Sequence, residues 1–154
     1  MNIFYLDKSP KTCAKYHNDK HVVKMILETA QLLCGAHWST GGQAPYKLSH
    51  KNHPCSIWVR QSEENYLWLC MLGRELCHEY TRRYGKIHKT SEVLTWCADN
   101  RPNIPKGKFT EPPLAMPDDC KIANSAILSY RNYYIKEKRD FCSWKNTTTP
   151  SWFK

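Results

Sequence analysis

The hydrophobic positions of the chain alternate loosely at its start and take on a helical spacing from about residue 12. Residues 1–7 form a short segment in which apolar and polar positions alternate loosely, which predicts an extended arm. Ser9-Pro10 then marks a turn at which a helix can start. From about Thr12 to Leu33 apolar residues return every three or four positions, which predicts one helix that Gly35 and the pair Gly41-Gly42 end. The expected apolar side of this helix consists of Val22, Val23, Ile26, Leu27, Ala30, Leu33 and Cys34.

The middle of the chain carries signals for a second long helix and a shorter one. Asn52-His53-Pro54 combines a capping residue with a first-turn proline, so a helix is expected from there to Tyr84. Gly85 is its expected stop, and Gly73 is a point at which it can divide. A shorter helix is expected over residues 91–98.

The last third combines an irregular segment with a final helix. Five of the nine prolines fall within residues 100–118, so this stretch is expected to be a long irregular loop, either functional or mobile. Ser125 is expected to start the last helix, in which aromatic and basic residues are interleaved. No internal repeat or linker is visible, so residues 1–154 are expected to form one compact all-α domain with an extended N-terminal arm.

Composition narrows the setting of this domain. Hydrophobic residues make up 41% of the chain and charged residues 24%, which is compatible with a packed core. The longest apolar run, Leu67–Leu72, is far shorter than the roughly 20 residues of a bilayer span, and no secretory signal is recognisable. The eight cysteines are scattered singly with no Cys-x-x-Cys pair. We therefore expect a reduced cytoplasmic protein without a membrane partner.

The charge balance points to nucleic acid. The chain has 23 Lys and Arg against 14 Asp and Glu, a net charge of +9, which attracts phosphate backbones. Aromatic residues near the basic ones of the last helix are candidates for stacking on bases, although half or more of them are expected in the core. They are Tyr130, Tyr133, Tyr134 and Trp144. A basic protein with a merely solvated surface is the alternative.

The first long helix carries the most informative polar cluster. At about 100° per residue, His21, Lys24 and Glu28 lie within roughly 60° of one another, on the side away from the expected apolar set. A base, an acid and a histidine thus form one stripe that the core does not require. The plainer interpretation is a solvated helix face with an i, i+4 Lys–Glu pair.

Searches for a metal site or a familiar nucleophile give little. His17 with His21 and His50 with His53 are paired in sequence, but no Cys pair or HExxH pattern supports them. No metal or other cofactor is therefore expected, and a hydrolase that uses the histidines remains an alternative. The motifs of serine hydrolases, phosphate-binding loops and deaminases are absent. Amines remain, and an α-amine, with a pKa near 7.7–8.0, is far more often neutral at pH 7.5 than lysine.

Four short segments together resemble the pyrimidine-dimer DNA glycosylases, the family of phage endonuclease V and its bacterial relatives. They are M-N-I-F-Y-L at the start, K-M-I-L-E-T-A-Q-L-L in the first long helix, H-K-N-H-P in the following loop and P-S-W-F-K at the end. The matches occur in order over nearly the whole chain, and the last two are the more specific. The resemblance also leaves open a virus-encoded protein that acts in the host cell.

This resemblance implies a monomeric, all-helical DNA repair enzyme that acts on duplex DNA containing pyrimidine dimers or related damaged pyrimidines. In the family the N-terminal amine attacks C1′ of the damaged nucleotide, displaces the base and forms a Schiff base that allows strand cleavage. The implied catalytic residues are Met1 and Glu28. The implied DNA-binding residues are Asn2, His21, Lys24, Asn52, His53 and Arg60. Trp152 and Phe153 match an aromatic segment that packs near the lesion in the family.

Two departures from the family pattern affect the implied nucleophile. Asn2 is bulky, so Met1 is expected to be retained and to supply the amine. The stretch Pro10–Tyr16 has no obvious counterpart in the family, and if this insertion moves the terminus away from Glu28, the catalytic role fails although the fold is kept. A basic nucleic-acid-binding protein of the same fold without catalysis is the alternative function. The sequence leaves the preferred lesion open.

Overall fold

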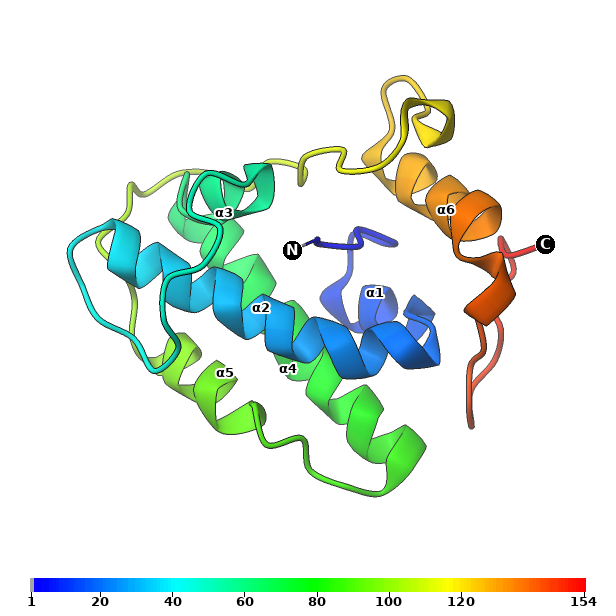
Figure 1. Cartoon of the computed structure of the whole chain (residues 1–154), viewed down its shortest axis with the longest axis horizontal. Helices are drawn as coiled ribbons and strands as arrows, with labels where there is room; N and C mark the ends of the chain where they lie inside the picture. The colour runs from blue at the N-terminus through cyan, green and yellow to red at the C-terminus, as the bar shows by residue number, and fades with distance from the viewer. Residues whose placement is uncertain (1) are drawn as a thin grey trace.

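Two long helices, α2 (Asp19–Ser39) and α4 (Glu63–Tyr84), pack against each other at the centre of the molecule (Figure 1). The computed structural model describes residues 2–154, and this part of the chain forms six α-helices and two short 3₁₀ helices with no β-strand. The predicted all-α fold is confirmed. The remaining elements are α1 (Pro10–Tyr16), α3 (Pro54–Val59), α5 (Ser91–Asp99), α6 (Ala126–Glu137) and the 3₁₀ helices Asp118–Cys120 and Arg139–Phe141.

The single helix predicted from about residue 12 is wrong in its continuity, and of its two predicted stop signals only the pair Gly41-Gly42 lies at the observed end. The backbone leaves the helical region at His17 and Asn18, and the Asn18 side chain caps α2 by accepting a hydrogen bond from the His21 amide. Gly35 does not end α2, which continues to Ser39. Gly35 is buried inside this helix, so tertiary packing overrides its weak helix propensity.

The second predicted helix is also interrupted, but at another place than expected. The chain turns at residues 60–62 between α3 and α4, and Ser62 caps α4 by accepting from the Asn65 amide. Gly73 does not divide α4. A Cβ at that position would lie 2.9 Å from a methyl group of Leu94, so glycine permits the close approach of α5. Gly85 ends α4 with φ of 69°, as predicted.

The N-terminal arm is the most deeply buried irregular segment. It is extended, as predicted, and Ile3, Phe4, Tyr5 and Leu6 are all buried in the core. In Figure 1 the arm lies at the centre of the molecule, between α2 and the segment that connects α5 to α6. Hydrogen bonds hold it there: Arg131 donates to Leu6 O at 2.9 Å, and Trp68 donates to Lys8 O at 3.0 Å.

Residues 100–117 are irregular, as predicted, and are fixed to the helices along their length. The Trp58 indole and the Ser62 hydroxyl donate to carbonyls of Thr110 and Lys108, and the Tyr130 hydroxyl donates to Pro113 O. The segment therefore follows α3 and α4 and then passes beside the N-terminal arm to reach α6 (Figure 1).

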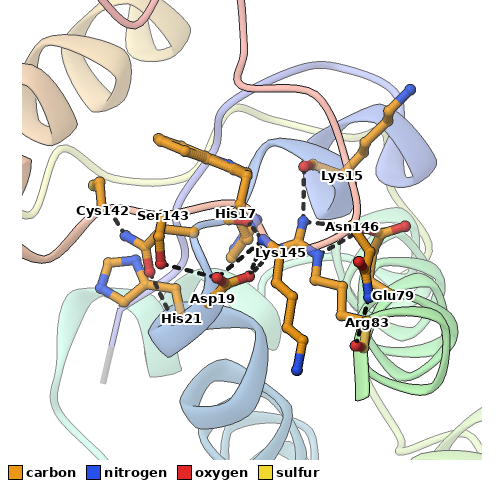
Figure 2. A network of polar contacts seen from close by, with 12 residues as sticks. Lys15, His17, Asp19, His21, Glu79, Arg83, Cys142, Ser143, Lys145 and Asn146 are labelled. Atoms are coloured by element: carbon orange, nitrogen blue, oxygen red, sulfur yellow. Dashed lines mark hydrogen bonds and ion pairs between the residues drawn. The ribbon is translucent and has the colours of Figure 1, made fainter. Parts of the chain in front are cut away.

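A fully buried arginine joins the two ends of the chain (Figure 2). Arg83 donates to the carbonyl oxygens of Lys15 and His17 and to the carboxylates of Asp19 and Glu79, at 2.8–3.1 Å. The Asp19 carboxylate also accepts hydrogen bonds from Ser143 Oγ and from the amide of Lys145. This network holds the α1–α2 junction, the end of α4 and the segment 143–146 together.

Candidate active site

The second residue of the chain lies against Glu28. The backbone amide of Asn2 donates to Glu28 Oε1 at 3.3 Å, and the Asn2 side chain donates to the carbonyl of Ala115 at 3.3 Å. Asn2 is thus held between α2 and the Pro-rich segment. Met1, the predicted nucleophile, lies outside the residues that the structure describes.

The extra stretch Pro10–Tyr16 does not separate the arm from Glu28. It folds into α1, which packs against α4 and lets the arm return along α2. Cys13 of α1 donates its thiol proton to Phe4 O at 3.1 Å, which ties this helix directly to the arm. Asn2 therefore lies next to Glu28, and Phe4 next to His21 of α2.

The stripe of His21, Lys24 and Glu28 differs from its prediction. Glu28 is only 9% exposed and His21 is 5% exposed, while Val23 and Leu27, which were expected on the apolar side, are 40% and 41% exposed. The physical reason is the arm, which covers the side of α2 that carries His21 and Glu28. The spacing of apolar residues along α2 could not predict this burial, because the contact is made by a distant segment of the chain.

Lys24 forms the expected pair with Glu28. Its Nζ lies 3.7 Å from Glu28 Oε2, and its side chain is 71% exposed while that of Glu28 is 12% exposed. A pair of this kind contributes little to stability. Its position matters more, because it sets a solvent-facing cation immediately beside a mostly buried carboxylate.

His21 lies in an aromatic environment away from solvent. Its ring stacks on Phe4 with centroids 4.2 Å apart, and Nδ1 is 2.7 Å from the Tyr134 hydroxyl. Burial lowers the pKa of His21 to about 2, so the ring is neutral at physiological pH. This placement supports a role in holding the arm more than a direct contact with DNA.

The predicted loop residues lie at the start of α3, which packs against α2. His53 is the N-cap residue of α3, and its Nδ1 accepts a hydrogen bond from the Cys55 amide at 3.0 Å. Burial lowers the pKa of His53. Asn52 is exposed, and Arg60 donates to Lys51 O at 2.8 Å, so the arginine fixes the loop.

Cys55 is a fully buried thiol in the first turn of α3. Burial raises the pKa of Cys55 to about 11. A thiol with this pKa is almost entirely protonated at neutral pH, so it is a poor nucleophile.

The C-terminal aromatic residues contact other helices of the fold. Trp152 meets the edge of Tyr16 at 5.7 Å, and the guanidinium of Arg131 lies 5.4 Å from its ring. Phe153 packs on Trp144 at 4.8 Å. Of the four aromatic residues expected to be shared between base stacking and the core, Tyr130 and Tyr134 are fully buried, as the prediction of half or more required.

Several residues that position the arm were not predicted. They are Phe4, Ala115, Arg131 and Tyr134. Each belongs to a segment far from α2 in sequence, and no spacing rule links them to Glu28. The alternation of the arm was the only available signal, because it marked Phe4 as part of an extended segment.

Two surface hollows lie outside this cluster. The larger, of about 490 Å³, is at the C-terminal end of α2, where its lining includes His37, Trp96 and Arg101. The smaller, of about 340 Å³, lies between α3 and the Pro-rich segment. Its lining includes Pro54, the residue after His53. Only the smaller one adjoins the loop that faces Glu28.

Comparison with known families agrees with this geometry. A family model for pyrimidine dimer DNA glycosylases matches residues 1–93, which include the arm, α1 to α4 and every predicted site residue. The chain belongs to this family. It is accordingly a DNA repair glycosylase that acts on damaged pyrimidines in DNA.

No curated protein and no solved structure matched the chain. None of the helices in residues 2–154 has the length and apolar character of a membrane span.

Proposed function

We propose that the protein is a glycosylase with AP-lyase activity that works through the α-amine of Met1 and the carboxylate of Glu28. The hydrogen bond from the Asn2 amide to Glu28 Oε1 carries this proposal. The bond lengths of a single residue keep the amine of Met1 within about 7 Å of that oxygen in any conformation. A nucleotide that reaches Glu28 would therefore also be within reach of the terminal amine.

The reaction forms and breaks bonds at C1′ of the damaged nucleotide. The neutral amine bonds to C1′ while the bond to the base breaks, and the electron pair of that bond leaves with the base, which then takes a proton from water. One amine proton passes to Glu28 and on to O4′ as the sugar ring opens, which leaves a protonated Schiff base. Loss of a proton from C2′ then expels the 3′ phosphate and cuts the strand.

Glu28 supports this sequence through its charge and its burial. The transition state and the Schiff base are cationic, and a carboxylate held at a fixed place in a partly desolvated site stabilises positive charge more strongly than water does. The Asn2 amide holds one oxygen in place by a hydrogen bond, and the Lys24 ammonium lies 3.7 Å from the other. The carboxylate is therefore oriented before DNA binds.

The partner is duplex DNA containing a pyrimidine dimer or a related damaged pyrimidine, bound by a monomer. A net charge of +9 favours the phosphate backbone, and the lysines Lys20 and Lys24 of α2 are exposed, with Lys24 beside Glu28. A lesion that already distorts the duplex lowers the cost of moving the nucleotide out of the stack.

Borohydride trapping tests this proposal. Reduction should lock the Schiff base with an oligonucleotide duplex that contains a cyclobutane dimer, and the adduct should map to the first peptide of the chain. An N-terminal extension replaces the amine with an amide and should abolish trapping, whereas Lys24→Ala should retain it. An adduct on a lysine would overturn the assigned nucleophile. The absence of an adduct from protein that binds the duplex would favour a non-catalytic binder.

A further inference from the structure

The N-cap residue of α3 is a histidine at a position where serine, threonine, aspartate and asparagine are preferred. His53 performs the capping with its ring, since Nδ1 accepts the hydrogen bond of the Cys55 amide. Departures from local preference of this kind are expected at functional sites. The cap alone does not require an imidazole, because smaller side chains can accept the same hydrogen bond. A functional reason for histidine at this position must therefore involve its other ring nitrogen, Nε2.

The cap determines which nitrogen of His53 carries the proton. A nitrogen that accepts a hydrogen bond has no proton of its own, so the neutral ring holds its proton on Nε2. Protonation of Nδ1 would break the cap, and burial also lowers the pKa of His53. The side chain is thus a neutral imidazole that offers one N–H donor.

This donor is available and lies near the reacting centre. His53 is half-buried, and within residues 2–154 its Nε2 has no hydrogen-bond partner. His53 belongs to the cap of α3, which packs against α2, the helix that carries Glu28, and Cys55 in the first turn of α3 is fully buried. The start of α3 therefore lies against the helix of the reacting centre.

We propose that Nε2–H of His53 donates a hydrogen bond to O2 of the departing pyrimidine, a role that rests on the glycosylase mechanism proposed above. As the bond from C1′ to the base breaks, negative charge develops on the base, and O2 is the base oxygen closest to that bond. The hydrogen bond stabilises this charge and transfers no proton. His53 is then a third catalytic residue, specific to base release.

The charge state of His53 suits this role. A cation beside Glu28 would weaken the stabilisation that the carboxylate gives to the positive sugar, whereas a neutral donor leaves it intact. Phosphate oxygens are better partners for the exposed cations Lys20 and Lys24. A neutral donor is better matched to a carbonyl oxygen that gains charge only in the transition state.

His53→Asn separates the donor from the cap. Asparagine is a good N-cap residue, so α3 should remain folded, which thermal unfolding will verify, and His53→Ser is a second capping variant should the first lose stability. The matched control is His50→Asn in the same loop. His50 has φ of 52°, a conformation that asparagine tolerates, and its ring contacts Ser49 at the surface.

Single-turnover rates on two duplexes test the proposal. With a cyclobutane dimer, His53→Asn should slow base release about 100-fold, the loss typical of one transition-state donor. With a preformed abasic site no base departs, so incision and borohydride trapping should stay within about twofold of wild type. His50→Asn should match wild type on both duplexes.

The outcomes distinguish this inference from the mechanism on which it rests. An equal loss on both duplexes would place His53 at the sugar or phosphate, and no loss on either would remove it from the reaction, so both results overturn the proposal. Failure of the wild-type protein to form any adduct on the abasic duplex would instead overturn the amine mechanism itself.

Discussion

The rings of Phe4 and His21 stack with their planes only 26° apart, and this contact fixes the direction of the arm. Asn2 lies at Glu28, and Phe4, two residues later, lies at His21, which is seven residues earlier in α2. The arm therefore runs antiparallel to α2 across two helical turns. Two contacts at separate points along a rigid helix determine where the start of the chain can lie.

Phe4→Ala should destabilise the fold strongly. The side chain is buried among His21, Tyr130 and Tyr134, and removal of a buried phenylalanine typically costs about 3–5 kcal/mol. Urea unfolding monitored by circular dichroism measures the loss. Leu128→Ala, on the exposed face of α6, is the control and should change stability by less than about 0.5 kcal/mol. A similar small change for Phe4→Ala would mean that the arm does not contribute to the core.

The buried histidines should make stability depend on pH. Burial lowers the pKa of His17 to about 4 and that of His21 to about 2, against an ordinary value of 6.5. Between pH 6.5 and 4 these two rings are largely protonated in the unfolded chain and largely neutral in the folded protein. Stability is therefore complete above about pH 7 and falls on acidification, by up to about 1.4 kcal/mol per pH unit for each histidine.

Unfolding free energies at pH 7 and pH 5 measure this effect. His21→Gln should show a smaller decrease between the two values than the wild-type protein, because one of the two proton-binding groups is removed. His78→Gln is a suitable control, since His78 is exposed on α4. Equal pH dependence in wild type and His21→Gln would show that His21 is protonated in the folded state.

The sequence predicts local features of this fold well. Ser125 and Gly85 were identified as helix boundaries because capping is a short-range interaction between neighbouring residues. The Pro-rich segment was recognised because proline removes a hydrogen-bond donor wherever it stands. The joint between α1 and α2 was missed, although Asn18 is a preferred N-cap residue and caps α2 locally; the distant part of this joint is the Tyr134 hydroxyl, which accepts from the Asn18 amide.

The sequence predicted which residues of α2 belong to the site, but not the distant contacts that bury them. Glu28 and Lys24 were paired correctly by their spacing on one helix. The burial of Glu28 and His21 depends on the arm, and the arm depends on Ala115, Arg131 and Tyr134, which follow it by more than a hundred residues. Contacts of that range leave no periodic trace in a single sequence.

Arg83→Met should unfold the protein at much lower denaturant concentration. The side chain is fully buried, and its loss removes the buried cation that donates to the Asp19 and Glu79 carboxylates and to two carbonyl oxygens. Breaking a buried ion pair by removing one partner costs about 3–5 kcal/mol. Arg82→Met, one position earlier and exposed, is the matched control and should cost about 1 kcal/mol or less. Comparable losses for both variants would contradict the importance of burial.

Lys24→Ala should weaken DNA binding without changing its selectivity. The exposed ammonium can meet a phosphate, and a phosphate contact contributes equally on damaged and undamaged duplexes. Titrations between about 50 and 200 mM salt should show a steep decrease in affinity for the wild type and a salt slope that is smaller by about one for the variant. A loss confined to damaged DNA would place Lys24 at the lesion.

Glu28→Gln should abolish base release and strand cleavage while DNA binding is largely kept. Glutamine preserves the size of the side chain and an oxygen that can accept the Asn2 amide, so the arm keeps its position. The charge that stabilises the cationic sugar and Schiff base is removed, which should lower the single-turnover rate by at least about 100-fold. Gel-shift affinity for a duplex with a cyclobutane dimer should change by less than about threefold. Lys24→Ala, which alters the other side of the ion pair, should retain most of the rate. Cleavage by Glu28→Gln at the wild-type rate would remove Glu28 from the mechanism and leave the arm beside it as a purely structural feature.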